Sequence, residues 1–125
     1  MYQWNQQPSD YSNICKIADE ITSSYPYFQK YIYGKSLCGR DLIALESTCK
    51  GELGRQPVLF AAAFHGMEWI TTSILLCFTE RLCKAAQQEK TLCGKDAAAA
   101  LQHSRFIIVP CVNPDGVEIQ IHGAE

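Results

Sequence analysis

Two short, uninterrupted apolar runs constrain the fold of this chain more than any other feature of its sequence. The first is Val58–Phe64, which Pro57 opens, and the second lies within Arg105–Val109. A continuous apolar run of this length, bounded by turn residues, predicts a strand that is buried on both faces of a sheet. Such strands belong to sheets that are covered by helices.

Helical periodicity appears on both sides of the first run. Apolar residues recur at steps of three and four over 11–25, where Asp10 or Ser12 can cap the helix. A largely buried helix is expected over 68–84. A second helix is expected over 95–103.

The remaining segments predict strands and turns. Residues 27–36 and 41–48 are expected to form two strands joined by a turn at Gly39. A loop over 110–116 is followed by the alternating segment 117–121, which predicts a short strand. The order of elements indicates an α/β fold with three α/β/α layers and a sheet of mixed direction.

Composition excludes several classes of protein. The 125 residues allow one domain, since domains run to roughly 100–200 residues. Eleven Lys and Arg against 13 Asp and Glu argue against a nucleic-acid binder or a polybasic membrane-surface protein. No apolar run approaches the ~18 residues of a membrane span, and the first residues do not resemble a signal peptide. We therefore expect a globular cytoplasmic protein, with export by another route as the alternative that the sequence leaves open.

The cysteines support the same compartment. Seven is an odd number, and no Cys-x-x-Cys pair occurs, so neither a disulfide framework nor a zinc ribbon is indicated. Cys77 and Cys83 are expected on different faces of one helix. All seven are predicted to be free thiols in a reducing compartment, at positions 15, 38, 49, 77, 83, 93 and 111.

His65 and Glu68 are the strongest candidates for chemistry. They lie three residues apart where a predicted buried strand ends and a helix begins, which is where ligands bind in open α/β sheets. Imidazole nitrogen and carboxylate oxygen are both ligands that Zn²⁺ accepts. The helix dipole favours a carboxylate at Glu68, and Gly66 lets the chain turn sharply. A purely structural role remains the alternative, with His65 bonded to backbone and Glu68 favouring the helix start.

A second segment, Asn113–Gly116, follows the other predicted buried strand. Its sequence Asn-Pro-Asp-Gly is that of a turn, in which Pro114 fixes φ, Asp115 can form an Asx-type hydrogen bond and Gly116 tolerates positive φ. Taken alone, this segment predicts only a structural loop.

Together and in this order, the segments resemble the zinc carboxypeptidase family over nearly the whole chain. Gly34–Arg40 is similar to an early Gly-x-Ser-x-x-Gly-Arg hairpin of that family, and Pro57–Trp69 to its strand leading into His-Gly-x-Glu-Trp. Arg105–Gly116 is similar to its Pro-x-x-Asn-Pro-Asp-Gly segment. Met67 and the residues after Gly116 are most similar to bacterial members that cleave γ-D-glutamyl-diamino-acid bonds in cell-wall peptides.

The resemblance implies a zinc-dependent hydrolase that acts on peptides, including murein-derived ones. It implies that His65 and Glu68 are two of three zinc ligands, and that a bound water attacks the scissile carbonyl. The third ligand, the general base and the other catalytic groups are expected downstream, so residues 1–125 are expected to be the N-terminal part of one catalytic domain, incomplete and inactive alone. His103 and His122 are not predicted to be ligands, and Pro110–Gly116 is expected to shape the floor of the site.

Two other functions remain open at this point. The His-x-x-Glu pair also fits an N-acyl-amino-acid deacylase of related fold, although Asn113–Gly116 argues against it. Because only two expected ligands are present, the chain could also be a catalytically dead binding domain built on the hydrolase scaffold.

Overall fold

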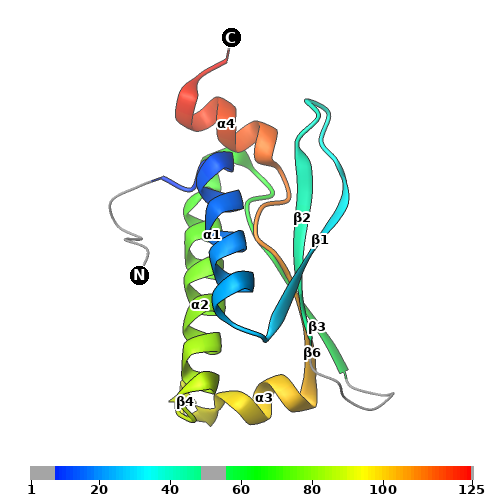
Figure 1. The fold of residues 1–125 in the computed structure, drawn as a ribbon. Helices are drawn as coiled ribbons and strands as arrows, with labels where there is room; N and C mark the ends of the chain where they lie inside the picture. Colours follow the sequence, from blue (N-terminus) through cyan, green and yellow to red (C-terminus); the bar gives the residue numbers. More distant parts are fainter. Residues whose placement is uncertain (1–7, 49–55, 125) are drawn as a thin grey trace.

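The computed structural model describes residues 8–48 and 56–124, which form a four-stranded mixed sheet with the strand order β1-β2-β6-β3 (Figure 1). The antiparallel pair β1 (Phe28–Lys35) and β2 (Asp41–Ser47) is the predicted hairpin. β6 (Ser104–Val109) pairs antiparallel with β2 and parallel with β3 (Gln56–Ala61). The predicted mixed direction of the sheet is therefore confirmed.

Three helices lie on one side of this sheet in Figure 1: α1 (Tyr11–Ser24), α2 (Ile70–Gln87) and α3 (Ala97–His103). Asp10 caps α1 as predicted, since its carboxylate accepts a hydrogen bond of 2.9 Å from the amide of Asn13. The main core lies between these helices and the sheet. Its most buried members include Ile17, Ile21, Leu45, Leu76, Cys83 and Ile108.

β6 and β3 differ in burial, although their sequences predict the same environment. β6 lies between two strands, and Ile108 is fully buried. β3 is the last strand of the sheet in the described part of the chain, and the side chain of Leu59 is 64% exposed. Phe60 stacks against Phe106 with ring centroids 6.1 Å apart. The prediction that β3 is buried on both faces is wrong for this structure, because α1, α2 and α3 cover only one side of the sheet and no described strand lies beyond β3.

The strand predicted over 117–121 is also wrong. These residues belong to α4 (Pro114–His122). Asn113 is its N-cap, since its side-chain oxygen accepts a 3.0 Å hydrogen bond from the amide of Gly116, and Pro114 occupies the first turn. The Asn-Pro-Asp-Gly segment therefore starts a helix. Val117 and Ile121 lie one turn apart, so alternation along the sequence did not indicate a strand.

Smaller features complete the described structure. β4 (Thr91–Leu92) and β5 (Lys95–Asp96) form a short hairpin between α2 and α3 that the sequence did not predict. The six described cysteines are free thiols, as predicted, and Cys49 lies outside the described residues. None of the helices in the described ranges combines the length and the hydropathy that a membrane span requires.

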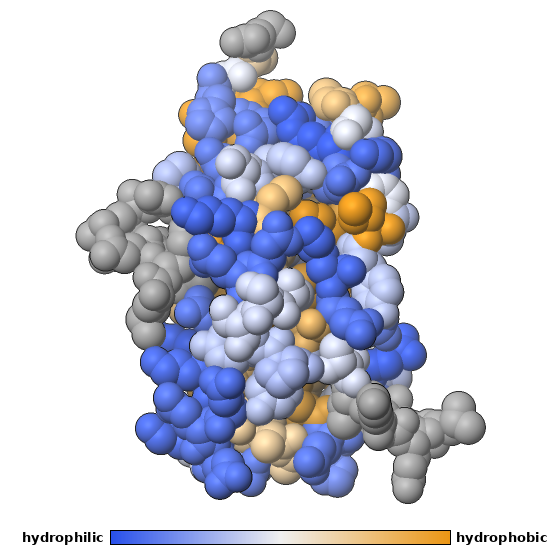
Figure 2. All heavy atoms as spheres, in the orientation of Figure 1, coloured by the Kyte–Doolittle hydropathy of each residue, from blue (hydrophilic) through white to orange (hydrophobic). Residues whose placement is uncertain are grey.

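The surface shown in Figure 2 is largely hydrophilic, and hydrophobic residues gather near its top. Figure 1 places the tip of the β1–β2 hairpin and α4 in that region. Leu37 at the hairpin tip and Ile119 on α4 are both exposed. Hydrogen bonds of Asp115 on α4 to Ser36, Cys38 and Arg40 join these two elements.

Candidate metal centre

His65 and Glu68 come together on a tight turn between β3 and α2. This turn is the 3₁₀ helix η1 (Gly66–Glu68), so Glu68 precedes the α-helix and does not lie in its first turn. Nδ1 of His65 is 3.6 Å from Oε1 of Glu68, and both side chains are exposed to solvent. The structure thus places the two predicted ligands side by side and accessible.

Backbone and side-chain hydrogen bonds hold this turn in place. The amide of Glu68 donates to the carbonyl of His65 over 3.0 Å. The hydroxyl of Thr71 donates to the carbonyl of Glu68 over 2.7 Å and accepts from the amide of Ala63 over 2.9 Å. Ala63 has a φ of 54°, a left-handed conformation that costs energy for a residue with a side chain. The fold therefore maintains an unfavourable backbone two residues before His65.

Gly66 has a role that differs from the one predicted. It is absent from the glycines with positive φ, so a sharp turn does not require it. A Cβ atom at this position would lie 2.2 Å from the carbonyl oxygen of Gly116, far inside van der Waals contact. Gly66 is required because the backbone of η1 packs directly on the backbone at the start of α4.

The segment after β6 supports the turn from behind, in agreement with its expected role as the floor of the site. The amide of Val112 donates to the carbonyl of Ala62 over 2.9 Å, and that of Asn113 to the carbonyl of Ala63 over 3.0 Å. The side-chain amide of Asn113 reaches the carbonyl of Phe64 over 3.3 Å. Hydrogen bonds thus join the segments that follow β3 and β6, and the last of these bonds reaches Phe64, the residue before His65.

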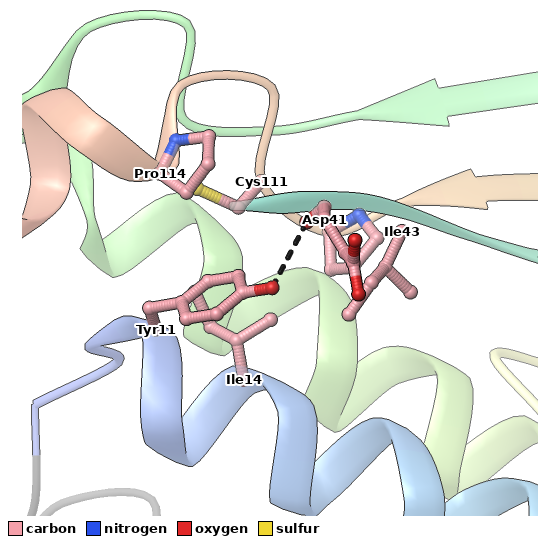
Figure 3. A pocket seen from close by; sticks show the side chains of 7 residues that line it. Tyr11, Ile14, Asp41, Ile43, Cys111 and Pro114 are labelled. Carbon is pink, nitrogen blue, oxygen red and sulfur yellow. Dashed lines mark hydrogen bonds between the residues drawn. The ribbon is translucent and has the colours of Figure 1, made fainter. Parts of the chain in front are cut away.

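Little free space remains behind this loop. Figure 3 shows a cavity between α1, β2 and the 110–114 segment, with a volume of about 10 Å³. This is close to the minimum for one water molecule. The hydroxyl of Tyr11 donates to the carbonyl of Asp41 across it, over 3.2 Å. This cavity is too small for a ligand larger than water, whereas the side chains of His65 and Glu68 are open to solvent.

Asp115 makes a set of contacts that the sequence did not reveal. Its carboxylate accepts hydrogen bonds from the hydroxyl of Ser36 over 2.8 Å, the amide of Cys38 over 3.0 Å and the guanidinium of Arg40 over 2.8 Å. Burial raises the pKa of Asp115, but Arg40 and the other donors outweigh burial and lower it to about 2. This carboxylate ties the β1–β2 turn to the start of α4, and does not form the local Asx turn that was predicted.

The motif segments contained a partial signal for this contact. Ser36 and Arg40 belong to the Gly-x-Ser-x-x-Gly-Arg hairpin, and Asp115 to the Asn-Pro-Asp-Gly segment. The first segment carries a positive charge and the second a negative one, but nothing in the local sequence pairs these residues across 75 positions.

The other two histidines lie elsewhere: His103 ends α3, as predicted, and His122 is in the last turn of α4.

The donor set and spacing of His65 and Glu68 fit zinc. Two ligand atoms bound to one tetrahedral zinc at ~2.0–2.1 Å are roughly 3.3 Å apart. The observed separation of 3.6 Å between Nδ1 and Oε1 needs only a small rotation of either exposed side chain to reach this value. The pair can therefore supply two positions of a zinc coordination shell, with further positions open to other ligands.

Comparisons with known proteins identify the family of this chain. A family model described as zinc carboxypeptidase matches residues 14–123. The uncharacterized protein YqgT of Bacillus subtilis is 31% identical over 124 residues, which cover 98% of this chain and 32% of that protein. Gamma-D-glutamyl-L-diamino acid endopeptidase 1 of Lysinibacillus sphaericus is 30% identical over 118 residues, which cover 94% of this chain and 29% of that protein. The chain thus spans about a third of the length of these relatives.

A solved structure shows the same fold. The crystal structure of thrombin activatable fibrinolysis inhibitor superposes with a TM-score of 0.80 at 24% identity, over 94% of this chain and 28% of that one. The family match includes β3, the His65–Glu68 turn and the Asn113–Gly116 segment. The chain belongs to the zinc carboxypeptidase family.

Proposed function

We propose that residues 1–125 are the N-terminal part of one zinc carboxypeptidase-type catalytic domain that hydrolyses peptide bonds. The observation that carries this proposal is the solvent-facing His65–Glu68 pair, 3.6 Å apart on the turn between β3 and α2. It lies within the segment that the family model matches.

His65 and Glu68 would hold zinc through one nitrogen and one oxygen. When bound, zinc polarises a substrate carbonyl and lowers the pKa of a coordinated water. The other residues of this chain hold His65 and Glu68 in position. Gly66 allows the turn to pack on the backbone of α4, and the side-chain amide of Asn113 donates to the carbonyl of Phe64 just before His65. These contacts keep both ligands at a fixed place above the sheet.

The proposed substrates are peptides, and among them murein-derived peptides. The support is the relative from Lysinibacillus sphaericus, whose name describes an endopeptidase for γ-D-glutamyl-L-diamino acids. The family match also favours peptides over N-acyl amino acids. Parallel assays with both substrate types, on a polypeptide that includes this chain together with the downstream region of the relatives, separate these two activities.

Zinc binding at the proposed site can be tested on the 125-residue chain by NMR. Zinc is expected to shift the ring signals of His65 in the wild type. Glu68→Ala should require a higher zinc concentration for the same shift, because one ligand is lost, whereas His103→Ala on α3 serves as a matched control and should behave as wild type. Ring signals of His65 that do not respond to millimolar zinc would overturn the assignment.

A further inference from the structure

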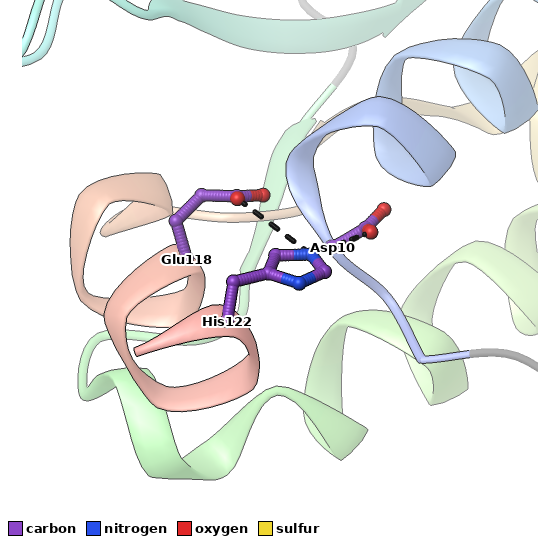
Figure 4. A group of neighbouring side chains, drawn as sticks. All are labelled: Asp10, Glu118 and His122. Atoms are coloured by element: carbon purple, nitrogen blue, oxygen red, sulfur yellow. Dashed lines mark hydrogen bonds and ion pairs between the residues drawn. The ribbon is translucent and has the colours of Figure 1, made fainter. Parts of the chain in front are cut away.

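Two side chains of α4 meet a third from the start of α1, apart from the pair described above. They are Asp10, the residue before α1, together with Glu118 and His122 on α4 (Figure 4). One ligand atom from each lies within 4.8 Å of the other two. Two carboxylates and one imidazole form a donor set that zinc accepts.

The two separations that involve His122 are close to those around a shared ion. Nε2 of His122 lies 3.0 Å from Oδ2 of Asp10 and 3.8 Å from Oε2 of Glu118. Ligand atoms around one tetrahedral zinc are roughly 3.3 Å apart. Both observed separations are within about half an ångström of that value. Small rotations of side chains that already face one another would suffice to coordinate an ion.

The two carboxylates are held in the orientation that coordination needs. Oδ1 of Asp10 accepts from the amide of Asn13 over 2.9 Å, and Oε1 of Glu118 accepts from the amide of Tyr11 over 2.6 Å. The second oxygen of each carboxylate faces His122. The Asp10 and Glu118 side chains are only 16% and 20% exposed. Outer hydrogen bonds of this kind fix the orientation of metal ligands.

Charge and access also favour a cation. Two carboxylates share a mostly buried position, and a divalent ion would balance their charge. The guanidinium of Arg40 attracts Glu118 electrostatically, but its hydrogen bond goes to Asp115. The carboxylate of Glu118 therefore remains available to a cation. His122 is half exposed, so an ion can enter from solvent and keep a water ligand.

We propose that Asp10, Glu118 and His122 form a second zinc site, which fastens the start of α1 to the last turns of α4. The site does not depend on the proposed peptidase function, because it shares no residue with the His65–Glu68 pair.

The test uses the 125-residue chain with His65→Ala and Glu68→Ala, so that only the second site remains. Calorimetric titration with Zn²⁺ alone is expected to give one zinc per chain. Adding His122→Ala should weaken zinc binding by more than about tenfold, because it removes a direct ligand. Even the loss of a residue that only hydrogen-bonds to a ligand typically costs about 10–100-fold in metal affinity. Adding His103→Ala instead, as a matched control on α3, should leave binding unchanged.

Asp10→Asn provides a second test that preserves the fold. Asparagine caps a helix as well as aspartate does, so α1 keeps its N-cap while the site loses one carboxylate. Binding should again weaken by more than about tenfold. If the background chain binds no zinc, or if zinc affinity survives both His122→Ala and Asp10→Asn, then the three residues form an ion pair only and the proposal is overturned.

Discussion

The backbones of Gly66 and Gly116 touch so closely that a single methyl group on Gly66 would lie 2.2 Å from the carbonyl oxygen of Gly116. This contact joins the turn that carries His65 and Glu68 to the first turn of α4. It explains why residue 66 is glycine, whereas a Cβ atom at Gly116 would instead collide with the side chain of Asn113, the N-cap of α4. The turn and α4 form one packed unit, so a change in the backbone of one is expected to displace the other.

Gly66→Ala is therefore expected to destabilise the chain and to weaken zinc binding at His65. The neighbouring atoms are backbone, so the turn itself must move, and overpacking of this kind costs about 1–3 kcal/mol. Urea unfolding measures the loss of stability, and the NMR signals of His65 report zinc binding. Gly34→Ala is the matched control, because its nearest neighbour, Cδ1 of Leu42, lies at an ordinary 3.7 Å. Equal effects of both substitutions would contradict the role assigned to Gly66.

Asp115 should make stability depend on pH in the acid range. Burial raises its pKa, but the bonds from Arg40, Cys38 and Ser36 lower it from 3.8 to about 2. A folded-state pKa below the unfolded value stabilises the fold above about pH 4, and this stabilisation is lost as the pH falls towards 2. The shift corresponds to about 2 kcal/mol for a side chain that is only 16% exposed.

Asp115→Asn should remove that contribution at pH 7 and flatten the stability curve between pH 4 and 2, as followed by urea unfolding at each pH. Asp19→Asn is the control, since Asp19 forms an exposed ion pair with Lys30. Such pairs contribute about 0–1 kcal/mol. A pH profile of Asp115→Asn that matches the wild type would show that Asp115 does not fasten the hairpin to α4.

The sequence predicted the parts of this fold that local chemistry determines. The capping aspartate and the three-and-four spacing gave α1, and Gly39 with two β-rich flanks gave the β1–β2 hairpin. The His65–Glu68 pair was predicted because three residues across a strand-to-helix boundary necessarily stay close in space. Each of these features depends on residues that are close to one another in the sequence.

The features that were missed depend on distant partners or on ambiguous signals. Asn113–Gly116 fits a turn and a helix start equally well, and only packing of Val117 into the core selects α4. The Asp115–Arg40 bond joins residues that no local pattern connects. The exposure of β3 depends on what lies beyond it in the sheet, which its own apolar sequence does not show.

Thiol reactivity should separate the cysteines into two groups. Burial raises the pKa of Cys83 to about 12 and that of Cys111 to about 11, so almost no thiolate forms at pH 8. Cys38 and Cys93 are exposed. In a Cys49→Ser background, an aromatic disulfide reagent should therefore label Cys38 and Cys93 rapidly and the two buried thiols only after unfolding. Rapid labelling of Cys83 in the folded chain would contradict its burial in the core.

The edge of β3, which no strand covers within residues 8–48 and 56–124, should cause self-association. Together with α2 it borders an apolar groove of about 440 Å³, lined by Phe60, Ala61, Ala62, Thr71, Ile74, Leu75 and Phe78. Exposed strand edges and apolar patches promote association. Ile74 is 64% exposed, so Ile74→Lys should add charge to the groove at little cost in stability and lower the apparent mass in light scattering at high concentration. Ile119→Lys, on the exposed side of α4, is the control and should leave the apparent mass unchanged. A wild-type chain that stays monomeric at every concentration would contradict this prediction.

The 125-residue chain alone should show no peptidase turnover even when zinc is bound. The two proposed ligands, His65 and Glu68, would hold zinc only weakly, and the general base that the family resemblance implies has no motif match in this sequence. A positioned acid or base typically contributes 10²–10⁴-fold to the rate, and organised electrostatic stabilisation contributes further.

In assays with γ-D-glutamyl-diamino-acid peptides and saturating zinc, the hydrolysis rate should equal that of the buffer control. The matched control is a polypeptide that continues through the region covered only by the longer relatives. Turnover by the short chain that disappears in His65→Ala would show that this chain already carries a complete site.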